Sequence, residues 1–132
     1  MIVVDTNIVA YLFLSSPMSH LAEKLRHHEP HWVAPRVWRS EMRNVLAHYR
    51  RRSMLTHVQA LMIQDRAERL LREREYELPS MAVLELVDQS DCSAYDCEFV
   101  ALARIFRIKL VTADKKLAAK FPDVAVLLND FT

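Results

Sequence analysis

The sequence contains no glycine among its 132 residues. This absence excludes the glycine-rich turns that let a backbone approach pyrophosphate in Walker loops and dinucleotide-binding folds. Any chemistry on phosphate groups must therefore depend on side chains and metal ions. Long apolar runs are also missing, because the only early one, Ile8 to Leu14, is too short to span a bilayer. It lacks a basic leader and a small-residue cleavage site, so we expect a cytoplasmic protein without a membrane segment.

Cysteine is scarce, and its spacing excludes two common uses. Cys92 and Cys97 lack the spacing of a redox pair, and no second pair is present to complete a structural zinc site. We therefore expect reduced, partly buried thiols. His27, His28 and His31 cluster in the sequence, but no neighbouring residue completes a tetrahedral ligand set. This stretch is interpreted as the end of a helix and a loop.

A strong overall charge is also absent, since the formal net charge is only +1. The distribution is less even: residues 36–75 carry ten arginines and five acidic residues, a net +5, which leaves −4 for the remainder. A solvated helical face and a nucleic-acid footprint both explain this concentration. The charge pattern alone leaves the two interpretations open.

The hydrophobic pattern alternates between strands and helices along the whole chain. Apolar runs typical of parallel strands that are covered on both faces occur at residues 2–4 and 109–111, and similar but weaker candidates occur at residues 32–34, 76–78 and 124–126. Helical patterns occupy residues 7–14, 19–28, 36–51, 57–74, 81–88, 94–106 and 115–120. This order predicts a single α/β domain over residues 1–132, with a central parallel β-sheet flanked by α-helices on both faces.

Two aspartates follow predicted strands. Asp5 ends the first strand, and Asp114 comes shortly after the strand at residues 109–111. Ligands of open α/β sheets bind beyond the carboxyl ends of the strands, so both side chains are expected at the functional edge. Each aspartate would also serve as the N-cap of the next helix, and for either residue alone that role is a sufficient explanation.

Two further acids lie on the apolar faces of predicted helices. Glu41 falls within a stripe that includes Trp38, Met42 and Val45, where a carboxylate needs either a salt-bridge partner or a ligand. Asp96 shares a face with the apolar residues three, four and seven positions later, although a capping box at the start of its helix would also explain it. One carboxylate cluster would explain all four acids together. Four like charges need a divalent cation, and ligands that are all oxygen select magnesium or manganese over zinc.

The order of these residues resembles the PIN domain family, especially the VapC-like toxins of bacterial toxin–antitoxin pairs. The resemblance rests on four segments and covers essentially the whole chain. They are Val4-Asp5-Thr6-Asn7, Glu41 on a middle helix, Ser93-Ala94-Tyr95-Asp96 and Val111-Thr112-Ala113-Asp114.

The resemblance implies an endoribonuclease that uses Mg²⁺ or Mn²⁺. Its acidic pocket would consist of Asp5, Glu41, Asp96 and Asp114, with Asp5 and Asp96 as direct metal ligands. Asp114 or Glu41 would either complete the ligand set or hold the attacking water. The polar residues that would orient these groups are Thr6, Asn7, Ser93 and Thr112.

The resemblance also implies three partners. The RNA substrate would be gripped by basic residues near the pocket, with candidates Arg36, Arg39, Arg43, Lys115 and Lys116. The other two partners would be a second copy of the chain, in a homodimer, and a small cognate antitoxin whose tail fills the active groove with a basic side chain. Met54, Leu61 and Met62 offer an apolar patch for such contacts, but core packing is the favoured use of these side chains.

Two other functions fit an acidic α/β domain less well. Metal-dependent phosphatases place a second aspartate two residues after the first-strand aspartate, whereas here Asp5 is followed by Thr6 and Asn7. A non-catalytic RNA-binding module would need the arginine-rich helices but not the four acids. Binding that survives chelation, without cleavage under any metal, would favour the second alternative.

Overall fold

The computed structural model describes residues 1–131, and Thr132, the last residue of the predicted domain, lies outside the described residues. Five strands and seven α-helices alternate along this part of the chain. The strands are β1 (Ile2–Val4), β2 (Trp32–Pro35), β3 (Glu75–Tyr76), β4 (Leu110–Thr112) and β5 (Ala125–Leu127). The helices are α1 (Thr6–Phe13), α2 (Ser19–His28), α3 (Trp38–Arg51), α4 (His57–Leu71), α5 (Ser80–Asp88), α6 (Ala94–Phe106) and α7 (Lys115–Lys120), followed by the 3-10 helix η1 (Leu128–Asp130).

All strand pairs are parallel, and the order across the sheet is β3-β2-β1-β4-β5. Strands β2 and β3 are therefore added on one side of β1, and β4 and β5 are added on its other side. The change of direction leaves a crevice at the carboxyl ends of β1 and β4, where ligands of open α/β sheets bind. This topology confirms the predicted α/β fold with a central parallel sheet.

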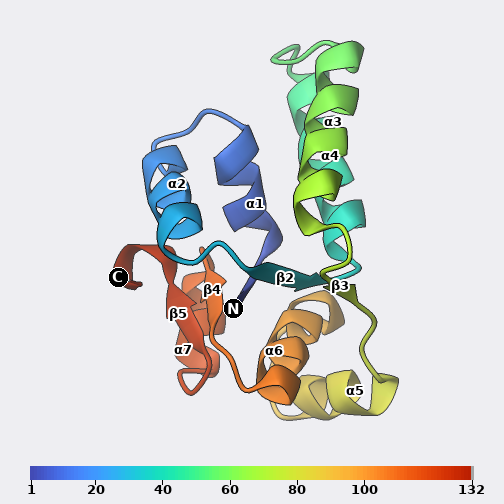
Figure 1. The fold of residues 1–132 in the computed structure, drawn as a ribbon. Helices are drawn as coiled ribbons and strands as arrows, with labels where there is room; N and C mark the ends of the chain where they lie inside the picture. Colours follow the sequence, from blue (N-terminus) through green and yellow to red (C-terminus); the bar gives the residue numbers. More distant parts are fainter. Residues whose placement is uncertain (132) are drawn as a thin grey trace.

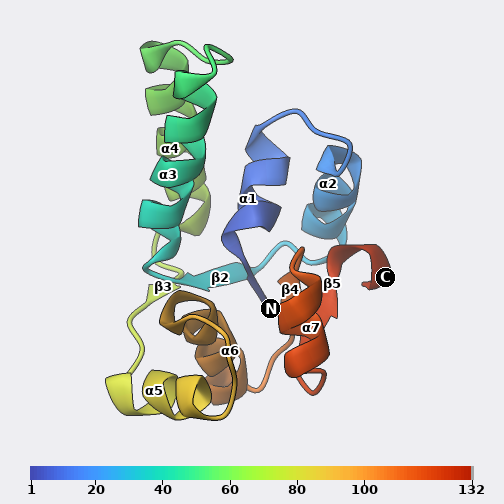
Figure 2. The same cartoon turned by 180° about the vertical axis from the view of Figure 1, so that it is seen from behind.

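Helices cover both faces of the sheet. The helices that precede β3 lie on one side, and α5, α6 and α7 lie on the other (Figures 1 and 2). Right-handed crossovers dictate this division, because the direction of strand addition reverses after β3. The core forms between the layers and includes Val3, Val4, Leu110 and Val111, all of which are fully buried. None of the helices within residues 1–131 is both long and apolar enough to cross a membrane.

Helices α3 and α4 lie side by side and project beyond the sheet as an arm (Figures 1 and 2). Thr56 begins α4 with a capping box in which its side chain and that of Gln59 each accept a hydrogen bond from the other's backbone N–H. Met54, Leu61 and Met62 of the arm are 60%, 57% and 48% exposed, so the prediction that they pack in the core is wrong. The outer end of the arm extends beyond the sheet, so the sheet does not cover it (Figures 1 and 2).

The base of the arm is fixed by a buried carboxylate. Glu75 of β3 accepts hydrogen bonds from the indole N–H of Trp38 at 2.7 Å and from Nε and Nη2 of Arg39 at 2.6 and 2.7 Å. Arg39 also pairs with Glu68 of α4 at 3.1 Å. These bonds lower the pKa of Glu75 even though its burial raises it. The network ties the start of α3 to the sheet and to α4.

Several predicted boundaries move by a few residues. Helix α3 begins at Trp38 rather than Arg36, because the backbone N–H of Arg36 donates to the Tyr76 carbonyl at 2.9 Å and extends the contact between β2 and β3. Helix α4 ends at Leu71 rather than Arg74, since Glu73 has a positive φ of 66° that no helix continues through. The helices predicted at 19–28, 94–106 and 115–120 are confirmed with the same bounds.

Candidate active site

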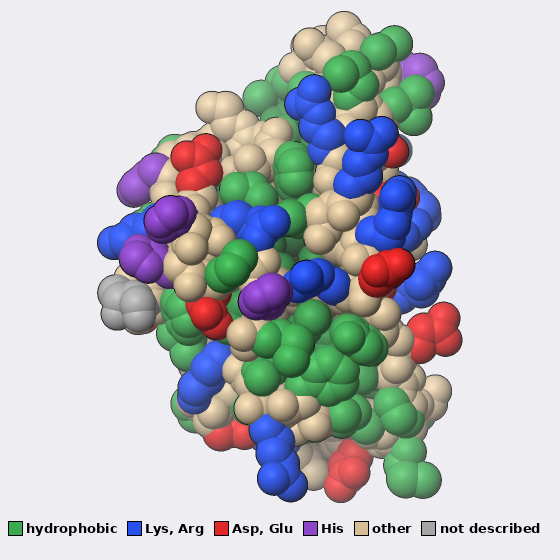
Figure 3. Space-filling model, in the orientation of Figure 1, with side chains coloured by type: hydrophobic (Ala, Val, Ile, Leu, Met, Phe, Trp, Pro, Cys, Tyr) green, Lys and Arg blue, Asp and Glu red, His purple; other side chains and the backbone are tan. Residues whose placement is uncertain are grey.

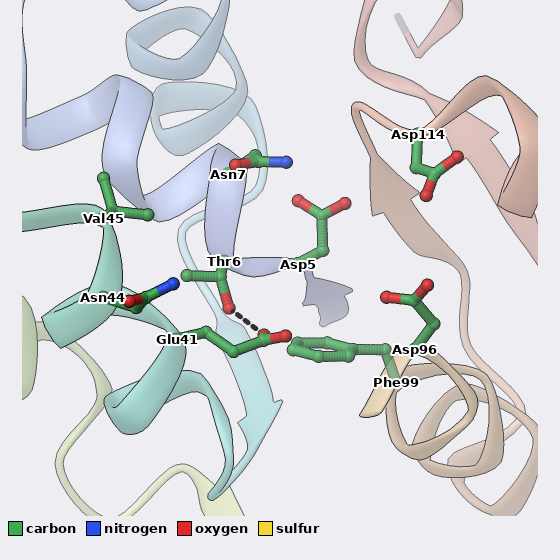
Figure 4. Close-up of a pocket in the computed structure, with 9 residues that line it drawn as sticks. All are labelled: Asp5, Thr6, Asn7, Glu41, Asn44, Val45, Asp96, Phe99 and Asp114. Atoms are coloured by element: carbon green, nitrogen blue, oxygen red, sulfur yellow. Dashed lines mark hydrogen bonds between the residues drawn. The ribbon is translucent and has the colours of Figure 1, made fainter. Parts of the chain in front are cut away.

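A polar cavity of about 240 Å³ opens at the carboxyl ends of β1 and β4 (Figure 4). Its walls come from α1, α3, α6 and the start of α7, which are distant in the sequence. The lining residues are Asp5, Thr6, Asn7, Glu41, Asn44, Val45, Asp96, Phe99 and Asp114. The four acids predicted to form one site thus line a single cavity.

Asp5 is held at the floor of this cavity by three hydrogen bonds. Its Oδ1 accepts from the backbone N–H of Ile8 at 3.2 Å and so caps α1, while its Oδ2 accepts from the Ala113 N–H at 3.1 Å and from the Thr112 hydroxyl. The side chain is only 8% exposed. Burial raises the pKa of Asp5, the charge of Asp114 adds to the rise, and the hydrogen bonds offset part of it. The capping role and the pocket role therefore coexist in one residue.

Asp114 is the N-cap of α7 and follows β4. Its Oδ1 accepts from the backbone N–H groups of Lys116 and Leu117 at 2.9 and 3.1 Å. Its own backbone N–H donates to Oγ1 of Thr112 at 3.0 Å. Thr112, fully buried at the end of β4, therefore links the two strand-end aspartates through one hydroxyl.

Glu41 reaches the cavity from the first turn of α3. Its Oε1 accepts from the hydroxyl of Thr6 at 2.6 Å, the bond that is drawn in Figure 4. Burial raises the pKa of Glu41, the charges of Asp96 and Asp5 raise it further, and the Thr6 hydrogen bond partly offsets both. Glu41 has no basic partner within residues 1–131, so the salt bridge that the sequence left open is not formed.

Asp96 enters from the first turn of α6. Ser93 caps this helix by accepting from the Asp96 backbone N–H at 3.0 Å. Burial raises the pKa of Asp96, the charge of Asp114 adds to it, and Ser93 and Lys116 offset part of the rise. The carboxylate of Asp96 faces the space that Asp5 and Asp114 also face (Figure 4).

The chemistry of this cavity fits a hard divalent cation. Its ionisable side chains are all carboxylates, and three of the four have raised pKa values because they are buried beside one another. A cation would remove the repulsion between their ionised forms. Among residues 1–131, no three His, Cys, Asp or Glu side chains are already arranged to coordinate one ion.

None of the five predicted RNA-binding residues lines the cavity. Arg39 is occupied by Glu75 and Glu68 at the base of the arm. Arg36 and Arg43 are exposed but are not among the lining residues. Lys116 is exposed beside Asp114, with its Nζ 3.4 Å from Asp91, and Lys115 is exposed next to it. In the view of Figure 3, Lys and Arg side chains gather along the arm.

Three residues of the cavity were missed in the sequence. Asn44 and Val45 follow Glu41 by three and four positions, the spacing that places side chains on one helix face, and this signal could have identified them. Phe99 stands three residues after Asp96 for the same reason and is 2% exposed. These side chains add an amide and two apolar surfaces to an otherwise acidic site.

The fold and the site define a class of protein, an α/β domain whose parallel sheet gathers carboxylates in one cavity at the switch point of its strands. Residues 2–124 match the PIN domain. The chain belongs to the PIN domain family, whose members are generally nucleases and typically depend on metal. No curated protein matches the sequence significantly.

Solved structures share this fold at low sequence identity. The crystal structure of PAE2754 from Pyrobaculum aerophilum has a TM-score of 0.76 at 20% identity, over 97% of this chain and 90% of that chain. The crystal structure of FitAcB from Neisseria gonorrhoeae has a TM-score of 0.72 at 17% identity, over 96% of each chain. A structure of FitAB bound to IR36 DNA fragment has a TM-score of 0.73 at 16% identity, over 100% of this chain and 98% of that chain. At these identities the likeness establishes the fold alone.

Proposed function

We propose that this protein is an endoribonuclease that hydrolyses RNA phosphodiester bonds with the help of Mg²⁺ or Mn²⁺. One observation carries the proposal: Asp5, Glu41, Asp96 and Asp114 come from four separate segments and line one cavity. Helix capping accounts for Asp5 and Asp114 individually, but it does not account for four carboxylates placed together, three of which have raised pKa values. Their convergence is therefore interpreted as a site for a cation and a phosphate.

The size of the cavity suits one segment of a polymeric substrate. Its volume of about 240 Å³ lies below the roughly 300–1,000 Å³ of pockets that enclose a whole small molecule. Only one part of a longer chain, such as a phosphodiester and its adjacent sugar, would enter. Single-stranded RNA presents such a backbone without the steric barrier of a duplex.

Asp5 and Asp96 are the proposed metal ligands, because both carboxylates face the common space between them and Asp114. When bound, Mg²⁺ or Mn²⁺ would lower the pKa of a water molecule and offset the charge of the phosphodiester. Thr112 keeps Asp5 oriented, and Thr6 keeps Glu41 oriented. Glu41 or Asp114 would accept the proton of the attacking water, a role that suits a carboxylate whose pKa is raised, as that of Glu41 is.

Positive charge around the cavity would hold the RNA backbone. Lys115 and Lys116 are exposed at the start of α7 beside Asp114, and Arg36 and Arg43 are exposed near the base of the arm. We expect these four side chains to contribute to phosphate binding, with a salt dependence typical of counterion release. We expect Arg39 to affect RNA binding only indirectly, by holding α3 in place, because its guanidinium is paired with Glu75.

The proposal extends to the biological setting that the resemblance to VapC-like toxins implies. The protein would act in the cytoplasm as the toxin of a toxin–antitoxin pair, as a homodimer, and a small antitoxin would cover the acidic cavity with a basic side chain. The structure of FitAB bound to IR36 DNA fragment gives a fold relative that occurs in a complex with DNA. The exposed side chains of Met54, Leu61 and Met62 provide apolar surface for protein contacts.

The test is cleavage of a mixed RNA pool by the purified protein, free of any partner, in Mg²⁺, Mn²⁺ or chelator. Asp5→Asn and Asp96→Asn are the site variants, and Asp88→Asn, an exposed aspartate of α5, is the matched control. We expect cleavage by the wild type and the control only when metal is present, and none by the site variants. RNA binding that resists chelation, with no cleavage in any metal, would replace the nuclease with an RNA-binding module.

A further inference from the structure

The acidic cavity has two walls of different chemistry. Asp5, Asp96 and Asp114 form one wall, and α3 forms the other with Glu41, Asn44 and Val45 (Figure 4). The aspartate wall suits a cation and the phosphate that the cation attracts. The α3 wall therefore lies beside whatever part of the substrate is next to that phosphate.

Asn44 is the polar residue of the α3 wall whose side chain is free to bind a ligand. Glu41 is held by Thr6 at 2.6 Å, whereas the side-chain amide of Asn44 hydrogen-bonds no other residue within 1–131. The Asn44 amide lies at the cavity in the close-up, next to the apolar side chain of Val45 (Figure 4). Asn44 is exposed, so the amide is available to a bound molecule.

The chemistry of an amide at this position is selective. An ionised carboxylate can only accept hydrogen bonds and repels a phosphodiester, whereas an asparagine amide both donates and accepts without charge. The 2′-hydroxyl of ribose also donates and accepts, and it is the group by which a protein distinguishes RNA from DNA at a given site. Val45 adds an apolar surface against which the C–H groups of a sugar can pack.

We propose that Asn44 binds the 2′-hydroxyl of a nucleotide beside the cleaved bond and thereby makes the enzyme prefer RNA over DNA. This inference rests on the proposed nuclease function and specifies its substrate. Asn44 acts as a specificity-determining residue, and the chemical step remains with the carboxylates and the metal.

The test uses an RNA oligonucleotide that contains a cleavage site found in the RNA pool. Matched strands carry a single 2′-deoxy nucleotide at each position next to the cleaved bond, and one strand is entirely deoxy. The proteins are the wild type, Asn44→Ala and Asn129→Ala, the last an exposed asparagine of η1 outside the cavity. Alanine favours helix more than asparagine does, so Asn44→Ala is expected to leave α3 folded.

For the wild type and Asn129→Ala, we expect one deoxy position to lower kcat/KM by about 3- to 10-fold, the effect of a single net hydrogen bond. Asn44→Ala should lower kcat/KM on all-ribose RNA by a similar factor, and the same deoxy substitution should then have no further effect. Because this readout is a ratio of two substrates on one protein, a general loss of folded enzyme does not change it.

Three results would overturn the inference. A deoxy effect that persists undiminished in Asn44→Ala would mean that another group contacts the 2′-hydroxyl. Equal cleavage of the RNA and the all-deoxy strand by the wild type would mean that the 2′-hydroxyl is not recognised at all. If the wild type cleaves none of the strands in either metal, the proposed nuclease function fails first, and the role of Asn44 fails with it.

Discussion

Metal binding should stabilise the fold by an amount that depends on Asp96. Asp96 faces the same space as Asp5 and Asp114, and burial and the charge of Asp114 raise its pKa, so its charged form is unfavourable without a cation. In Asp96→Asn, one of four like charges is removed while the shape of the side chain is kept. The variant should therefore be more stable than the wild type in chelator and less stabilised by Mn²⁺ or Mg²⁺.

The two effects are large enough to measure. A ligand at about 100 times its Kd stabilises the folded state by about 2.7 kcal/mol. The entropy of unfolding is about 0.28 kcal/mol/K for a chain of 132 residues, so metal should raise Tm by about 10 °C in the wild type. Relief of repulsion between partly exposed carboxylates is worth about 0.5–1 kcal/mol, so Asp96→Asn in chelator should gain about 2–4 °C.

Thermal unfolding followed by circular dichroism, with titrated Mn²⁺ and with chelator, measures both quantities. Asp88→Asn removes an exposed aspartate outside the cavity and controls for net charge. It should match the wild type in the size of its metal shift. An Asp96→Asn variant that gains as much from metal as the wild type, or that is less stable than the wild type in chelator, would refute the argument.

Three further predictions concern Glu75, Thr6 and the pH dependence of Asp96. Glu75→Gln should cost about 1–2 kcal/mol of unfolding free energy in urea, because the hydrogen bonds from Arg39 and Trp38 lose their charged acceptor, whereas Arg69→Ala, which breaks an exposed ion pair, should cost under about 0.5 kcal/mol. Equal costs would contradict this assignment. Thr6→Val should remove the hydrogen bond to Glu41 and lower kcat/KM on RNA about tenfold, which corresponds to about 1.4 kcal/mol. Unchanged kinetics would show that Glu41 does not need this hydrogen bond. In chelator, the stability advantage of Asp96→Asn over the wild type should grow as pH rises above about 4 and vanish below it. The pKa of Asp96 is raised in the folded state, so the native wild type holds more protons than the unfolded chain in this pH range. The stability of the wild type therefore falls with rising pH, whereas the asparagine of the variant does not titrate. An advantage independent of pH would point to packing instead.

Much of the site could be predicted from local pattern. Asp5 and Asp114 follow short apolar strands, and parallel strands that are adjacent in a sheet present their carboxyl ends at the same edge. Glu41 and Asp96 each occupy the apolar face of an amphipathic helix, and such a face must turn toward the rest of the molecule. These two regularities and the resemblance to the PIN domain family predict that the four acids form one site.

The ion pair between Arg39 and Glu75 could not be predicted in the same way. On the helix Arg39 lies opposite the apolar stripe, where it looks like a free basic residue suited to RNA. Its partner Glu75 is 36 residues away, on a two-residue edge strand whose sequence gives a weak strand signal. Only the pairing of β3 with β2 brings that carboxylate beneath the start of α3, and the ion pair follows from it.

The sequence by itself determined which residue types could bind a cation and on which elements they stand, because helix and strand periodicity are local properties of the chain. The tertiary structure decided which of them meet. The strand order β3-β2-β1-β4-β5 places β1 beside β4, and packing of α1 against α3 and of α6 on the sheet closes the walls of the cavity. Asn44 lines the same cavity as the acids for this reason too. Contacts between distant segments depend on how whole layers pack, which no short stretch of sequence encodes.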